Sequence, residues 1–111
     1  MNIKLKKFIE ACIAKGEAEE TGNVKPREDR KYYKIINSVY SYLKNNHQLE
    51  ELSNLLDHEN VYVQLWASSY MLQLSGSKAE KVLENLATLK GNIGFCAEMT
   101  LQEWRKGNLK F

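Results

Sequence analysis

The chain has 111 residues, of which 43% are hydrophobic and 27% are charged, and its formal net charge is +2. This composition is typical of one folded domain and excludes a disordered chain. So low a net charge also argues against a protein that binds nucleic acid over its whole surface.

The first half of the chain predicts a pair of helices. Apolar residues at helical spacing indicate a helix over residues 2–15, with Gly16 as its stop. Three acidic residues follow, and because they would be unfavourable at a helix C-terminus, we expect a loop over residues 16–25. Pro26 suits the first turn of a second helix, which we expect to end at residues 45–47.

The second half predicts shorter helices. A short helix over residues 49–56 is followed by a turn, and Asn60 is placed to cap a helix over residues 61–75. That helix is apolar on most of its sides, so we expect it to have neighbours around it.

Glycines and a capping sequence mark the last boundaries. Gly76 is expected to end the helix over residues 61–75, and Ser77 with Glu80 forms a capping box for the next helix. The last helix is expected to run from Ile93 to Gly107.

Residues 49–104 repeat themselves at an offset of 30 without a gap. The matched pairs are Leu49 and Ala79, Leu52 and Val82, Leu56 and Leu86, Val63 and Ile93, Leu65 and Phe95, Ala67 and Ala97, Met71 and Leu101, Leu74 and Trp104. A period of this length predicts stacked helical hairpins. We therefore predict one all-α domain of about six helices in three antiparallel pairs. It would comprise an N-terminal pair (1–46) and two repeat units (47–76 and 77–107).

The first repeat unit resembles a HEAT repeat. Its first helix ends near Asp57, and its second helix opens with Val63 and carries Ala67, as in that family. Gln64 stands where the family prefers Arg, and Ala87 stands where a second Asp would match Asp57, so the family's Asp–Arg ladder is incomplete. The resemblance implies a short right-handed HEAT-like stack whose second helices line the concave surface.

The C-terminal half also resembles a family of small bacterial HEAT-like domains of unknown function. The residues that carry this likeness are Asp57, His58, Asn60, Val63, Leu65, Trp66, Ala67, Ala79, Glu80, Val82, Leu83, Leu86, Ala97, Glu98, Met99, Thr100, Leu101, Glu103, Trp104 and Gly107. Residues 1–46 match no motif. The resemblance implies a bacterial protein without established chemistry, and such domains could serve as immunity proteins beside secreted toxins.

No motif in the sequence predicts catalysis. His47 and His58 are the only histidines, and no cysteine or second histidine stands at metal-ligand spacing from either. Glycine-rich phosphate loops and nucleophile motifs are also missing. We therefore expect no enzyme activity, no cofactor and no bound metal.

Aromatic residues on the second and fourth helices are candidate binding residues. Tyr62 and Trp66 lie on a face beside the inward stripe of the fourth helix, although Trp66 could equally pack in the core. Tyr33 and Tyr40 belong to a helix with more tyrosine than a core needs. We expect these four side chains to anchor a protein partner in a groove formed by the second, fourth and sixth helices.

A polar strip on the sixth helix is expected beside this groove. Glu98 is followed one turn later by Gln102 and two turns later by Arg105. These three side chains would form a polar rim, or Glu98 would instead tie the helix to a neighbouring helix end.

The predicted function is protein binding, in the concrete form of an immunity protein that neutralises a toxin by stoichiometric contact. Residues 1–46 carry 10 Lys and Arg against 6 Asp and Glu, a net of +4, whereas residues 47–111 carry 6 against 8, a net of −2. The basic cluster at residues 25–34 includes tyrosines, and this mixture can bind phosphates and stack on bases. Nucleic-acid binding is therefore the less favoured alternative, and a homodimer without another partner is a third.

The predicted location is the cytoplasm. Cys12 and Cys96 lie in apolar helical segments, so we expect buried thiols rather than a disulfide. Lysines interrupt the N-terminal apolar residues, so no signal peptide is expected, and no segment reaches membrane-spanning length.

Overall fold

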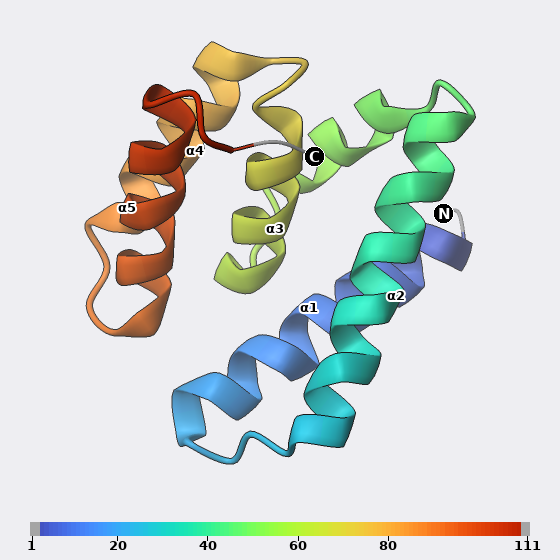
Figure 1. Cartoon of the computed structure of the whole chain (residues 1–111), viewed down its shortest axis with the longest axis vertical. Coiled ribbons are helices and arrows are strands. Elements are labelled where there is room, and N and C mark those ends of the chain that lie inside the picture. The colour runs from blue at the N-terminus through green and yellow to red at the C-terminus, as the bar shows by residue number, and fades with distance from the viewer. Residues whose placement is uncertain (1–2, 110–111) are drawn as a thin grey trace. The chain divides into compact units, whose positions relative to one another are not determined.

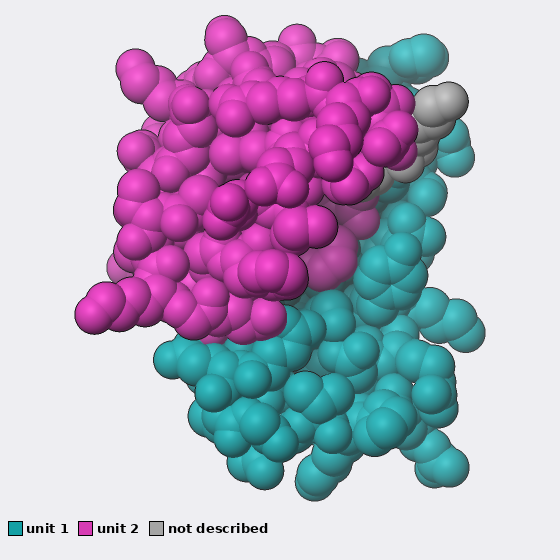
Figure 2. Space-filling view, turned by 60° about the vertical axis from the view of Figure 1, so that its left-hand side comes forward, with its two compact units in different colours: residues 1–49 teal, residues 50–111 magenta. Residues whose placement is uncertain are grey.

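The computed structural model describes residues 3–109, and all regular structure in that range is helical (Figure 1). The elements are α1 (Ile3–Thr21), α2 (Pro26–Asn45), the 3-10 helix η1 (Leu49–Leu55), α3 (Val61–Met71), α4 (Gly76–Ala87) and α5 (Asn92–Arg105). The chain divides into two compact units, residues 1–49 (unit 1) and residues 50–111 (unit 2), which Figure 2 colours separately. The predicted all-α class is confirmed.

Unit 1 contains the two longest helices, α1 and α2, which pack against each other (Figure 1). Phe8 and Cys12 of α1 are fully buried, as are Ile36 and Leu43 of α2. These residues recur at helical spacing, so each helix buries one apolar stripe and leaves its other sides polar.

α1 continues past Gly16, so the predicted stop there and the predicted loop over residues 16–25 are wrong. Gly16 is buried inside the helix, and the acidic residues that follow it are helical. The physical reason is Lys15, which bonds to Glu19 one turn later and to Asp29 on α2 and so compensates two carboxylates. The predicted start of this helix at residue 2 lies outside the described residues.

Three helices end with the same left-handed turn. A residue one or two positions after each helix end has a positive φ, which is 75° at Gly22, 56° at His47 and 78° at Gly107. Its amide and the next amide donate to carbonyls three and five residues earlier, a Schellman motif. The predicted ends at residues 45–47 and at Gly107 are confirmed, and His47 occupies a position that usually takes glycine.

Unit 2 contains α3, α4 and α5, and each of these helices contacts the other two. Asn60 caps α3, because its Oδ1 accepts hydrogen bonds from the amides of Tyr62 and Val63 at 2.9 and 3.3 Å. The predicted cap is confirmed, whereas the central place predicted for this helix stays a prediction, because all three helices of unit 2 contact one another.

The junction between α3 and α4 differs from the prediction. α3 ends at Met71, and Leu74 lies in the following turn with 54% of its surface exposed, so it does not belong to the inward stripe. Gly76 is the first residue of α4 rather than the stop of α3. Because Ser77 then lies inside α4, it cannot form the predicted capping box with Glu80.

The 30-residue repeat holds at buried positions and fails on outer faces. Ala67 and Ala97 are both fully buried, which lets paired helices approach closely. Leu65 is half-buried, whereas Phe95 at the matching position is 61% exposed. The repeat therefore describes the core of unit 2, while its outer surface is not repeated.

Gly94 allows the turn between α4 and α5 to fold against the first turn of α5. A β-carbon at position 94 would lie 1.9 Å from the backbone carbonyl oxygen of Leu89. That oxygen belongs to the main chain, so relieving the contact would require the whole turn to move. This close approach restricts position 94 to glycine.

We expect Gly94→Ala to lower the free energy of unfolding by about 1–3 kcal/mol, because the turn must shift to admit the methyl group. Gly76→Ala is the matched control, since a β-carbon there meets no atom within 4 Å. The control should be neutral or slightly stabilising, because alanine favours helix. Urea denaturation followed by circular dichroism compares the two, and equal stabilities would contradict the close approach at Gly94.

Candidate functional site

The structure separates the four predicted aromatic anchors by exposure. Tyr33 on α2 is 51% exposed, whereas Tyr40 on the same helix is only 5% exposed. On α3, Tyr62 is 9% exposed, and Trp66 is half-buried with its ring centroid 6.1 Å from that of Tyr70. Tyr40 and Tyr62 lie on the buried sides of their helices, so they serve packing here rather than forming an exposed anchor.

The predicted polar strip on α5 forms only in part. Gln102 Nε2 donates to Oε1 of Glu98 at 3.4 Å, the contact expected from their spacing. Arg105 turns instead to α4, where its guanidinium lies 3.2 Å from Glu80 and 3.3 Å from Glu84. Arg105 therefore ties α5 to α4, and the predicted reach of Glu98 toward it is wrong because two carboxylates of α4 hold it.

The groove predicted between the second, fourth and sixth helices would combine α2 of unit 1 with α3 and α5 of unit 2, and it stays a prediction. Two other surfaces lie within single units. One is an apolar face on α5, and the other is a basic groove on α2.

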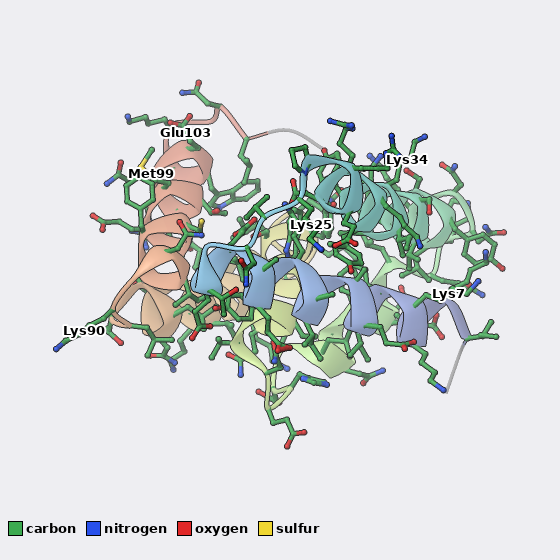
Figure 3. All side chains as sticks on the ribbon, turned by 90° about the horizontal axis from the view of Figure 1, so that it is seen from below. Lys7, Lys25, Lys34, Lys90, Met99 and Glu103 are labelled. Carbon is green, nitrogen blue, oxygen red and sulfur yellow. The ribbon has the colours of Figure 1, made fainter. Side chains whose placement is uncertain are left out.

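The α5 apolar face consists of Phe95 and Met99, one helical turn apart and 61% and 39% exposed. Met99 projects outward from α5 in Figure 3. The buried residues of this helix occupy its opposite side: Ile93, Ala97 and Leu101. The repeat did not reveal this face, because it matched Phe95 to Leu65, although helical spacing sets Phe95 and Met99 apart from the buried residues of α5.

The α2 basic groove is an open depression of about 800 Å³ on unit 1. Its walls include cationic side chains of α2, namely Arg27, Arg30, Lys31 and Lys34. Tyr33 and Ile35 also line it, and α1 contributes Lys15. The structure therefore brings most of the basic cluster predicted at residues 25–34 around one cavity.

Lys15 neutralises the acidic residue of this groove. Its Nζ lies 2.6 Å from Asp29 and 3.0 Å from Glu19. Burial lowers the pKa of Lys15, but the hydrogen bonds to Asp29 and Glu19 outweigh burial, and the pKa is raised above its usual value. Lys15 thus stays charged at neutral pH and links α1 to α2.

The histidines and cysteines occupy structural positions. His58 Nδ1 accepts the amide of Asn60 at 3.0 Å in the turn before α3. Cys12 and Cys96 are both thiols, and burial raises the pKa of the fully buried Cys12 far above its usual value. Cys96 is half-buried rather than buried as predicted.

Residues 3–109 contain neither a metal-binding cluster nor a helix that could span a membrane. No three His, Cys, Asp or Glu side chains in this range are grouped so that they could hold a metal ion. None of the helices there combines the length and apolar character needed to cross a bilayer. The expectation of no enzyme activity and no cofactor stays a prediction.

No protein-family model matches the chain, and no curated protein or solved structure is significantly similar to it. The resemblance to HEAT repeats and to small bacterial HEAT-like domains therefore stays a prediction. Function has to be argued from the two surfaces described above.

We expect Lys15→Met to lower the free energy of unfolding by about 1–2 kcal/mol at neutral pH, because two carboxylates lose their hydrogen-bond donor. The pKa of Lys15 is raised by folding. Its stabilisation is therefore complete below the pKa of unfolded lysine, about 10.4, and is lost as the pH rises through the higher folded pKa. Urea denaturation at about pH 7, 9 and 11 should show a deficit that persists at the first two values and shrinks at the third.

Lys7→Met is the matched control for this measurement. Lys7 also lies on α1 but is exposed, and it makes no ion pair within residues 3–109. Its removal should change stability by less than about 0.5 kcal/mol at every pH. If Lys15→Met behaves like Lys7→Met at neutral pH, Lys15 does not stabilise unit 1.

Proposed function

We propose that this chain is a non-enzymatic protein-binding module whose contact surface is the α5 apolar face. The supporting observation is that Phe95 and Met99 expose large apolar side chains next to each other on a helix whose inward stripe is separately buried. Removing such a pair from water is favourable, by about 1.5–3 kcal/mol for each fully buried side chain. A partner with a matching apolar pocket would gain this free energy on binding.

The polar neighbours of the α5 apolar face support a protein as the partner. Glu98 stands one turn after Phe95, and Gln102 stands one turn after Met99; both are exposed and bonded to each other. An apolar centre with a polar, solvent-accessible rim is the usual anatomy of a protein interface. In this proposal Glu98 and Gln102 keep their predicted rim role, while Arg105 does not.

The proposal also includes three predictions made from the sequence. They are that the chain forms a short HEAT-like stack, that it is cytoplasmic, and that it is a toxin-neutralising immunity protein that acts by stoichiometric contact. The buried pairs of the 30-residue repeat and the packing of α3, α4 and α5 support the stack within unit 2. Two cysteines that remain thiols suit a reducing compartment.

We expect the double variant Phe95→Ser with Met99→Ser to lose a partner that the wild-type chain captures in stoichiometric amount from its own host. With the purified partner, titration calorimetry should show a loss of at least about 2 kcal/mol, roughly thirtyfold in the dissociation constant. The physical reason is the loss of both apolar contacts, with the helix backbone unchanged.

The matched control is Ile3→Ser with Val24→Ser, which removes two exposed apolar side chains of unit 1, 69% and 45% exposed. This control should bind like the wild type. Retained binding by the Phe95 and Met99 variant would contradict the proposal. So would light scattering that shows a wild-type dimer and a monomeric variant, because the face would then be a self-interface.

A further inference from the structure

The α2 basic groove has a charge distribution that the low net charge of the chain conceals. Arg27, Arg30, Lys31 and Lys34 recur at helical spacing, so they form one row about 10 Å long. The buried Ile36 lies on the other side of α2. Lys34 accordingly projects from the side of α2 that faces away from α1 (Figure 3).

The four cations of this row make no ion pair within residues 3–109. The one carboxylate among the lining residues is Asp29, and Lys15 holds it at 2.6 Å. The groove therefore keeps nearly its full positive charge for a ligand, and an open site of this kind concentrates anions near the surface.

An exposed aromatic ring lies in the same groove. Tyr33 lines the cavity between the cations in sequence, and 51% of its surface is exposed. A half-exposed tyrosine offers a flat apolar face at which a planar group can stack. A carboxylate-rich ligand has no planar ring to stack on Tyr33. Every nucleobase can stack on an aromatic ring, whatever the nucleotide sequence.

We propose that the α2 basic groove binds single-stranded nucleic acid without sequence preference. The row of Arg and Lys would contact consecutive phosphates along about 10 Å of α2, and Tyr33 would stack on a base between them. The openness of the groove suits a flexible strand, whose bases are free to turn toward the ring. This inference concerns unit 1 only and does not depend on the α5 apolar face.

The proposal predicts a specific dependence on salt. Fluorescence anisotropy with a labelled oligothymidylate of about ten nucleotides measures the dissociation constant between about 25 and 200 mM salt. Four phosphate contacts at about 0.7 ions each give a slope of log affinity against log salt of about −2 to −3. Lys31→Gln with Lys34→Gln should reduce the magnitude of this slope by about 1.4 and weaken binding at low salt about tenfold.

The matched control is Lys6→Gln with Lys7→Gln, which removes two exposed lysines from α1 and changes the net charge of the chain by the same amount. It should bind like the wild type, because its lysines lie outside the groove. Tyr33→Ala should weaken binding about fivefold or more and leave the salt slope unchanged, since stacking releases no counterions.

Four outcomes would overturn the proposal. Three are no anisotropy change at the lowest salt, equal weakening by the Lys31/Lys34 and Lys6/Lys7 variants, and no effect of Tyr33→Ala. A fourth is competition by polyglutamate as effective as that by unlabelled oligothymidylate, which would show that the groove recognises negative charge alone and so fits an acidic protein segment. None of these results bears on binding through Phe95 and Met99.

Discussion

The packing of α3, α4 and α5 against one another is the interaction on which unit 2 depends. α3 has only 11 residues, and a helix of that length is marginal when isolated in water. Its stability must therefore come from packing, and the small residues Ala67 and Ser68 are fully buried. The hydroxyl of Ser68 donates to the carbonyl of Leu65, so its burial leaves no unsatisfied donor.

The ends of the helices matter as much as their faces in both units. The Schellman turns at Gly22, His47 and Gly107 satisfy carbonyls that would otherwise be unpaired. Gly94 acts differently, since its lack of a side chain lets a turn lie directly against α5. Glycine in this chain thus has two separate uses, left-handed backbone and close approach, and helical Gly16 has neither a positive φ nor a terminal place.

The sequence was sufficient to predict which residues share a face, but not which faces have neighbours. The repeat matched Leu56 with Leu86, Val63 with Ile93 and Ala67 with Ala97, and all six residues are buried. The repeat also includes Leu74, which lies in a turn and is exposed, and Phe95, which is exposed on α5. The spacing of apolar residues shows which side chains share one face of a helix. Whether that face is exposed depends on which other elements pack against the helix.

The same limit applies to the polar candidates. Local spacing along α5 predicted the bond between Glu98 and Gln102, because both lie on one helix. It could not predict that Arg105 would bond to Glu80 and Glu84, which are 25 and 21 residues away in sequence. An ion pair between helices depends on tertiary packing that no local pattern contains.

Net charge is a poor guide to anion binding here, because compensation is local. The cation of Arg105 is matched by carboxylates on α4, and that of Lys15 by Asp29 and Glu19. The row from Arg27 to Lys34 has no such partners within residues 3–109. A chain with a net charge of +2 can therefore present a groove whose field is that of several unpaired cations.

Salt screens the field of these cations beyond about 10 Å, whereas it does not weaken apolar contacts at the α5 apolar face. Raising the ionic strength should therefore lower the affinity of a ligand for the α2 basic groove but not that of a partner for the α5 apolar face.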